Sequence, residues 1–228
     1  MSKTKKKADK KLKSKSKKVE KLARAAGWVT GALEGGLSLA TPTRDLFGSI
    51  KQRRSHKKFK PTEVDPEKIR MLLDAAVLAP NHKMTQPWGF LVMGPRAKHV
   101  YADTKARLKL AGHMGVEGKA KAEQMIAEVL EIPTILGVTQ RLDHDPMRRE
   151  EDYAAVFMAI QNLLLAATAL GLGTKIHTGD ILDDTLFRSA LGLTAQDRLV
   201  AIVDIGEPAD EPAPKKRAPA SEKTRWLD

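Results

Sequence analysis

From residue 45 onward the apolar positions follow helical spacing, and two helix starts mark the pattern. Asp45 can cap a helix that runs through Ile50 to about Arg54. A second helix begins at residues 65–67, where a capping Asp precedes a proline in the first turn, and it stops at Pro80. The pattern therefore predicts two helices before the first strand.

Short apolar runs later in the chain predict strands at residues 88–93, 135–139 and 199–205. The first run ends at a Gly-Pro pair and the third at Gly-Glu-Pro, and both are turn sequences. Residues 96–130 are charged and helical in spacing, with a break near residues 112–118. The body of the chain is therefore expected to mix helices and strands.

The longest apolar stretch covers residues 154–170 and is slightly shorter than the ~20 residues of a membrane span. It also contains the polar residues Gln161 and Asn162. A helix that is apolar nearly all round has to be covered on all sides. The stretch therefore predicts a central helix, or a helix that a second subunit covers.

The net charge of +12 is concentrated at the N-terminus, because residues 1–24 hold eleven lysines and Arg24 against Asp9 and Glu20. This low-complexity segment is expected to be a disordered tail. It either solubilises the chain without a specific partner or makes a weak contact with nucleic acid or an anionic membrane. The absence of cysteine excludes disulfides, thiolate ligands and cysteine nucleophiles, and a cytoplasmic location is expected.

Residues 25–44 are small, rich in glycine and mildly apolar, which predicts a linker or a short helix. The sequence Thr-Pro-Thr-Arg-Asp at residues 41–45 marks the boundary after which the folded domain, residues 45–228, begins.

Two polar clusters are candidates for chemistry. Arg53, Arg54 and Ser55 follow the first predicted helix and could grip a phosphate, or the arginines could simply complement the helix dipole. Asn, His, Lys and Gln side chains occupy a loop between Pro80 and Pro87. Their donors suit the carbonyls and N1 edge of an isoalloxazine ring, and a polar surface turn is the alternative.

Two further segments gain interest from their position. The sequence Gly-Leu-Gly-Thr-Lys-Ile-His-Thr-Gly at residues 171–179 lets the backbone approach a flat ring, or it is a helix C-cap followed by a turn. It matches neither the dinucleotide fingerprint nor the Walker loop. The basic run at residues 215–217 becomes relevant only if the C-terminal segment returns to Arg53.

In this order the four segments resemble the nitroreductase family over about residues 45–228, and most closely its small bacterial members. Residues 79–83 and 86–88 match the family's Ala-Pro-Asp-His-Lys and Gln-Pro-Trp sequences, with Asn in place of Asp. The resemblance implies an α+β fold with a mostly antiparallel central sheet flanked by helices. It also implies an intertwined homodimer in which residues 154–170 form the dimer helix and FMN lies at the subunit interface.

Carried over residue by residue, the resemblance implies contacts with FMN from fifteen residues. Some of them depart from the family, because residues 176–179 are Ile-His-Thr-Gly where the small members tend to have Trp-Arg-Ser-Gly, and Lys57 stands where many members have Arg. The implied cofactor-binding residues are Arg53, Arg54, Ser55, Lys57, Leu78, Asn81, His82, Lys83, Gln86, Ile176, His177, Thr178, Gly179, Lys215 and Arg217.

The resemblance further implies an NAD(P)H-dependent oxidoreductase that takes electrons from NADH or NADPH and passes them to a small nitro-aromatic, quinone-like or related acceptor by ping-pong transfer. The flavin carries the hydride, so no side-chain nucleophile and no metal is expected. Flavin fragmentation, reductive dehalogenation and enone reduction are alternatives within the same superfamily. A binding protein with a lysine-rich tail and no activity is the alternative from another class.

Overall fold

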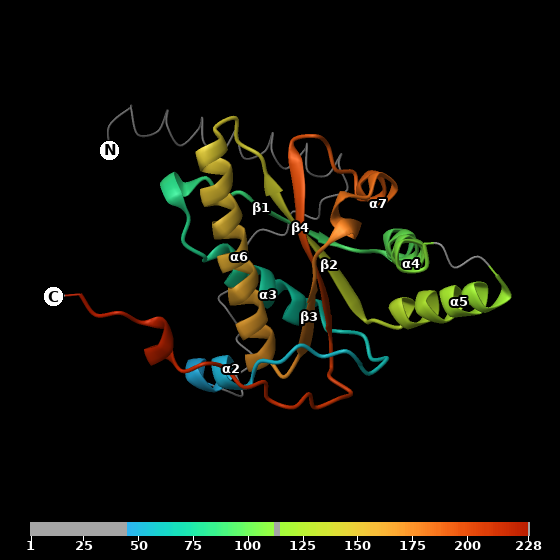
Figure 1. The fold of residues 1–228 in the computed structure, drawn as a ribbon, viewed down its shortest axis with the longest axis horizontal. Helices are drawn as coiled ribbons and strands as arrows, with labels where there is room; N and C mark the ends of the chain where they lie inside the picture. Colours follow the sequence, from blue (N-terminus) through green and yellow to red (C-terminus); the bar gives the residue numbers. More distant parts are fainter. Residues whose placement is uncertain (1–44, 112–114, 228) are drawn as a thin grey trace, which may run out of the picture. The chain divides into compact units, whose positions relative to one another are not determined.

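The computed structural model describes residues 45–111 and 115–227. The expectations for residues 1–24 and 25–44 lie outside the described residues. Figure 1 shows the fold, in which helices flank both faces of a twisted sheet.

The first two predicted helices are present. Helix α2 (Leu46–Gln52) begins where the Asp45 carboxylate accepts a hydrogen bond from the backbone N–H of Gly48. In α3 (Pro66–Val77) the Asp65 carboxylate accepts one from the N–H of Glu67 at 2.8 Å. Both caps satisfy N–H groups that have no partner within the helix.

The sheet has four antiparallel strands in the order β1-β2-β4-β3. Strands β1 (Trp88–Val92), β2 (Thr134–Arg141) and β4 (Asp197–Gly206) correspond to the three predicted apolar runs. Strand β3 (Gly173–His177) lies at the edge and pairs with the second half of β4, from Ile202 to Gly206. The predicted α+β fold with an antiparallel sheet is therefore confirmed.

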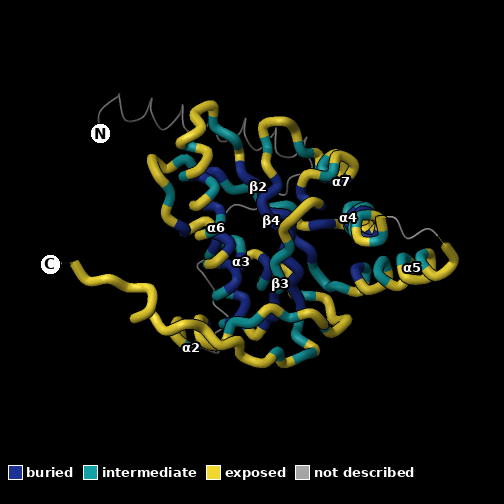
Figure 2. Tube along the Cα trace, viewed as in Figure 1, coloured by how far each residue is buried: buried dark blue, intermediate teal, exposed yellow. Residues whose placement is uncertain are grey.

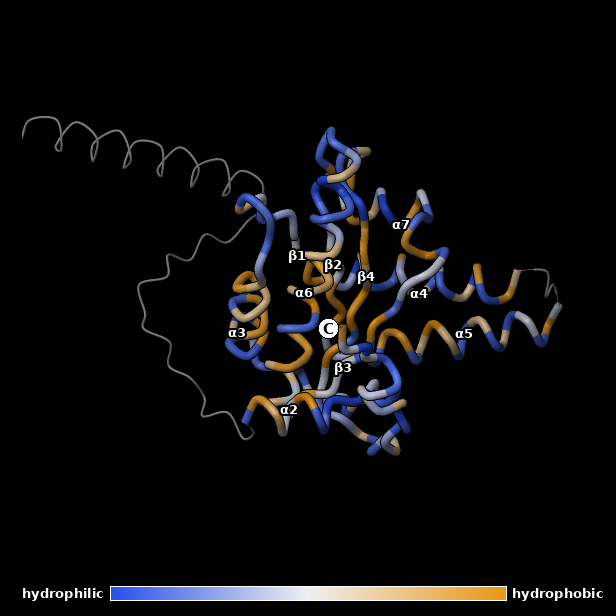
Figure 3. The backbone as a smooth tube through the Cα atoms, turned by 60° about the vertical axis from the view of Figure 1, so that its left-hand side comes forward, coloured by the Kyte–Doolittle hydropathy of each residue, from blue (hydrophilic) through white to orange (hydrophobic). Residues whose placement is uncertain are grey.

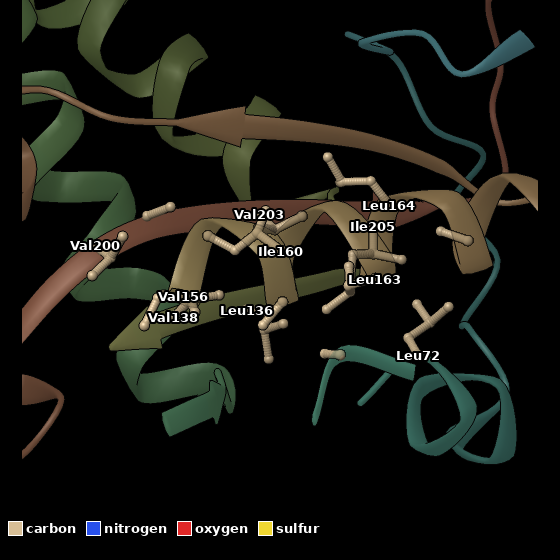
Figure 4. Close-up of a cluster of buried hydrophobic side chains, with 14 of the residues drawn as sticks. Leu72, Leu136, Val138, Val156, Ile160, Leu163, Leu164, Val200, Val203 and Ile205 are labelled. Atoms are coloured by element: carbon tan, nitrogen blue, oxygen red, sulfur yellow. The ribbon is translucent and has the colours of Figure 1, made fainter. Parts of the chain in front are cut away.

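Two apolar layers hold the helices to the two faces of the sheet. On one face α3 and α6 (Pro146–Ala169) pack on β2 and β4, and Figure 4 shows this cluster around Leu163, Leu136 and Val203. On the other face the sheet carries α4 (Pro95–Lys109), α5 (Val116–Leu130), η2 (Asp180–Asp183) and α7 (Thr185–Ala190) around Tyr101 and Phe187. Figure 2 shows that the buried residues follow the sheet and the sides of the helices that face it.

Helix α6 is longer than the predicted stretch, because it begins at Pro146. Asp145 caps it by accepting a hydrogen bond from the N–H of Met147 at 3.0 Å. Its first two turns consist mostly of charged residues, so the apolar pattern did not reveal where the helix begins. Among the described residues α6 alone is long and apolar enough to cross a membrane, but half of that window is buried in the protein, as in a core helix.

One side of α6 remains uncovered in the single chain. Val156, Ile160 and Leu163 are fully buried, whereas Met158 is 41% exposed. The less buried positions recur every three or four residues, which places them on one stripe of the helix. They are Ala154, Met158, Gln161 and Leu165.

Strand β3 occupies residues for which the sequence predicted a glycine-rich turn. Gly171 adopts a φ of 76°, which ends α6, and the chain then becomes extended at Gly173. Lys175 and His177 alternate with Thr174 and Ile176, so the strand lacks the apolar run that marks the other three. A short edge strand of this composition has no apolar signal of its own.

Candidate functional site

The segment that follows α2 is bound to the edge strand β3. Ser55 forms a parallel bridge with Thr174, and the N–H of His56 donates to the carbonyl oxygen of Thr174 at 3.0 Å. Further along, the N–H of Ala209 donates to the carbonyl oxygen of Lys58 at 3.0 Å. The sheet edge therefore fixes the position of the Arg-Arg-Ser sequence at residues 53–55.

A cavity of about 240 Å³ opens between this segment, β3 and α6. The sequence predicted three of its lining residues and missed the other three. Gln161 and Leu164 were read only as part of an apolar helix, and Thr174 only as part of a turn. The six residues are Arg53, Ser55, Gln161, Leu164, Thr174 and Ile176.

The cavity is positively charged. Burial lowers the pKa of the Arg53 guanidinium, and the charges of Arg54 and Arg217 lower it further. Arg53 has no carboxylate within ion-pair distance in the described part of the chain. A partly buried cation that other cations repel is stabilised by an anion, so this end of the cavity suits a phosphate.

The C-terminal segment returns to the neighbourhood of Arg53. The charge of Arg217 is close enough to lower the pKa of Arg53. Arg54 takes a different position from Arg53. Its Nη1 donates to the carbonyl oxygens of Lys51 at 2.8 Å and Arg53 at 3.0 Å, so it closes the C-terminal end of α2. Lys57 and Lys215 are exposed.

A clamp behind the cavity holds residues 53–57 in place. The Nδ1 atom of His56 lies 3.0 Å from the Asp210 carboxylate. The carbon atoms of the same side chain pack against Gly173. A Cβ at Gly173 would lie 2.9 Å from the His56 ring, which is too close for a real contact. The absence of a side chain at this position therefore lets His56 seat the segment.

We expect Gly173→Ala to destabilise the protein by about 1–3 kcal/mol, because the new methyl group overpacks a closed contact. The substitution should also loosen the segment that carries Arg53 and weaken ligand binding there. Thermal unfolding and a flavin titration measure the two effects. Gly94→Ser is the matched control, because a Cβ at Gly94 meets nothing within 4 Å and Ser is a good N-cap. Equal stability of both variants would contradict the clamp.

The second polar cluster forms a strained loop at η1 (His82–Met84). Lys83, Met84 and Gln86 adopt φ values of 51°, 55° and 46°, which side-chain-bearing residues rarely do. The Asn81 carboxamide oxygen accepts a hydrogen bond from the N–H of Gln86 at 3.0 Å and so closes the loop. Strain of this kind persists where the surroundings hold it and is common in ligand-binding loops.

The loop is attached to the first turns of α6. The Thr85 hydroxyl donates to the buried Asp152 carboxylate at 2.6 Å, and the His82 ring lies 3.7 Å from Glu151. The Asp152 carboxylate is a contact that the sequence did not reveal. Leu78, at the end of α3 just before the loop, is 80% exposed.

Within one chain the loop and the cavity lie at different ends of α6. The loop contacts Asp152, whereas the cavity is lined by Gln161 and Leu164. Nine to twelve residues at 1.5 Å per residue correspond to roughly 14–18 Å along the helix. Figure 1 shows the same separation, with α2 at the lower end of α6 and the loop before β1 at its upper end.

The glycine-rich segment divides between two faces of the sheet. Ile176 lines the cavity with Arg53, whereas the His177 Nε2 lies 2.5 Å from the Asp204 carboxylate behind the strand. Thr178 and Gly179 are exposed after the strand, and Gly179 adopts a φ of 105°. The structure therefore places Arg53, Ser55 and Ile176 together, separates His177 from them, and leaves the role of each residue a prediction.

Three comparisons with known proteins identify the family of the chain. The model of the nitroreductase family matches residues 50–207. YfhC of Bacillus subtilis, which is assigned as an NAD(P)H nitroreductase, is 33% identical over 178 residues, 75% of this chain and 88% of YfhC. A crystal structure of a nitroreductase-like protein from Bacillus cereus has a TM-score of 0.70 at 31% identity and covers 83% of this chain and 100% of that one.

A structure from Desulfovibrio desulfuricans, described as a nitroreductase in complex with FMN, has a TM-score of 0.62 at 27% identity. It covers 81% of this chain and 98% of that one. The chain belongs to the nitroreductase family, a family of oxidoreductases. Within residues 45–111 and 115–227, no three His, Cys, Asp or Glu residues gather as metal ligands.

Proposed function

We propose that the protein is an FMN-dependent oxidoreductase that takes electrons from NADH or NADPH and reduces a small nitro-aromatic or quinone-like acceptor. The observation that carries the proposal is the Arg53 cation, which lies in a cavity at the sheet edge with Arg217 nearby and without an ion pair to any carboxylate of residues 45–111 and 115–227. In a chain of this family, a cavity with one cationic end suits FMN, because FMN has a single terminal phosphate.

The residues present fit the cofactor. Arg53 and Arg217 can bind the phosphate, and the Ser55 hydroxyl and the Gln161 carboxamide can bind polar groups of the chain between phosphate and ring. When bound, FMN supplies the chemistry, because it accepts a hydride from the nicotinamide and delivers electrons to the acceptor. The protein binds the cofactor, orients it and limits the access of water.

The proposed site needs two copies of the chain. The uncovered stripe of α6 supplies an apolar surface for a second copy, and Gln161 belongs both to that stripe and to the cavity. A homodimer through this stripe would bring the Asn81–Gln86 loop of one protomer toward the Arg53 cavity of its partner. The exposed side chains of Leu78, just before the loop, and Met84, within it, would then be covered as well.

An absorption spectrum of the purified protein tests the proposal. We expect the visible bands of bound flavin, with FMN bound more tightly than FAD. Anaerobic addition of NADH or NADPH should bleach the bands, and a nitro-aromatic or quinone acceptor should restore them. Tighter binding of FAD than FMN, or a flavin that neither nicotinamide reduces, would overturn the proposal.

For the basic residues 1–24 we propose a weak, salt-dependent contact with polyanions or anionic membranes, separate from the flavin site. Deletion of residues 1–40 should leave flavin content and reductase activity nearly unchanged and abolish binding to DNA or anionic vesicles at low salt. Gel shift and vesicle sedimentation measure the contact. Loss of FMN or of dimerisation in the truncated protein would place this segment in the active unit instead.

A further inference from the structure

A second cavity, also of about 240 Å³, lies on the opposite face of β3. It is bounded by α4, the end of β3 and η2, on the side of the sheet away from α6 (Figure 1). The proposed flavin site does not use it. The side chains that determine its chemistry are Tyr101, Lys105, Lys109, His177, Asp180 and Ile181.

Two lysines of α4 give this cavity positive charge. Lys105 and Lys109 lie one helical turn apart on the same face of the helix. Neither has a carboxylate within ion-pair distance in the part of the chain that the structure describes. Burial lowers the pKa of Lys105, and the charges of Lys175 and Lys109 add to this shift, whereas Asp204 and Glu128 oppose it. An anion in the cavity would relieve this repulsion.

Two further polar groups lie at the cavity with hydrogen-bonding capacity unused. The His177 Nε2 is occupied by the Asp204 carboxylate at 2.5 Å, and the other ring nitrogen, Nδ1, makes no hydrogen bond to a described residue. The Tyr101 hydroxyl is completely buried and has no partner among the described residues. Burial, and secondarily Asp204, raise the pKa of the Tyr101 phenol, so it keeps its proton and can donate. An oxyanion in the cavity would accept hydrogen bonds from the two lysine ammonium groups.

We propose that this cavity is a second ligand site, which binds a small oxyanion such as a phosphate or carboxylate group. Asp180 is the only carboxylate on the described lining, and it is exposed at the rim, so the two lysines leave the lining net positive. Ligand pockets commonly measure about 300–1,000 Å³, so a cavity of this size suits a small anion better than a nucleotide. Figure 3 shows the mixture of hydrophilic and hydrophobic segments where α4 and β3 approach each other.

The test uses the full chain and follows the ring proton resonance of His177 by NMR, assigned through His177→Gln. Inorganic phosphate and acetate are titrated separately into the FMN-loaded protein and into Arg53→Ala, so that the Arg53 cavity does not contribute. We expect a saturable shift of the His177 signal in both samples. Tighter binding of phosphate would indicate a phosphorylated ligand, and tighter binding of acetate a carboxylate ligand.

The double substitution Lys105→Ala, Lys109→Ala should weaken this binding by about tenfold or more, because charge-assisted contacts are lost. Lys119→Ala, Lys121→Ala on the exposed face of α5 removes the same charge elsewhere and should leave it unchanged. No saturable shift with either anion, or equal weakening in the two double variants, would overturn the proposal. The inference is independent of the flavin proposal, since the Arg53→Ala sample tests it without that site.

Discussion

Arg53→Ala should lower FMN affinity by about ten- to a hundredfold and leave the fold intact. A hydrogen bond to a charged group contributes roughly 1.5–3 kcal/mol, and 1.4 kcal/mol corresponds to about tenfold in affinity. Arg53 makes no ion pair with a described residue, so its removal leaves no carboxylate unpaired there. Fluorescence titration with FMN measures the loss, and circular dichroism checks the fold.

Arg96→Ala is the matched control, because Arg96 is exposed on α4 and lies outside the Arg53 cavity. It should bind FMN as the parent protein does. Unchanged affinity in Arg53→Ala would make the arginine a helix-end charge, which is the alternative that the sequence left open. Equal weakening in both variants would point to the net charge of the protein instead of a specific contact.

Met158→Glu should convert the dimer to a monomer and remove bound flavin with it. The residue lies on the uncovered stripe of α6 and is 41% exposed in the single chain, so a carboxylate there is tolerated before assembly. In a dimer the same carboxylate would be buried without a partner, which costs several kcal/mol and weakens association by about a hundredfold or more. Light scattering and the flavin absorption of the same sample measure both losses.

Leu186→Glu is the control for this substitution. Leu186 is 66% exposed on α7, on the other face of the sheet from α6, so it introduces the same charge away from the stripe. The variant should remain a flavin-bound dimer. A Met158→Glu protein that stays dimeric would place the interface elsewhere, and a monomer that keeps its flavin would show that one chain forms the site alone.

The sequence predicted those parts of the fold that local chemistry determines. The caps at Asp45 and Asp65 act within a few residues of the helix that they begin, so they can be read without knowledge of the tertiary structure. The central strands β2 and β4 are buried between helices and therefore carry apolar runs, and the edge strand β1 is half-buried, with Trp88 and Phe90 packed on the core. Figure 4 shows side chains of β2 and β4 in the core against α6.

The prediction failed where an element depends on its neighbours. Strand β3 lies at the sheet edge, and its alternation of Thr174, Lys175, Ile176 and His177 contains no apolar run. The resemblance implies that Ile176 and His177 both contact FMN, and nothing in the local sequence separates them. Successive side chains of a strand point to opposite faces, so recognition of the strand would have separated them.

The sequence predicted a set of residues for the candidate site, but it did not predict how they are arranged in space. Arg53, Ser55 and Ile176 line one cavity, and the charge of Arg217 reaches Arg53. Their contacts with FMN stay predictions. Gln161 was not predicted, because a polar residue on an apolar helix gives no sign of which cavity it faces. The distance between the loop and the cavity along α6 is likewise a property of the packed helix and is not encoded locally.

A hybrid dimer tests the central claim, that two chains share each flavin site, most directly. One protomer carries Arg53→Ala, the other carries Asn81→Ala and Lys83→Ala in the loop, and each homodimer should bind flavin weakly. If each site combines Arg53 of one protomer with the loop of its partner, the hybrid contains an intact site and a doubly defective one. We therefore predict that mixing the two variants restores tight FMN binding at roughly half of the sites in the hybrid. Hybrids that bind no better than the two parent variants would contradict the shared site.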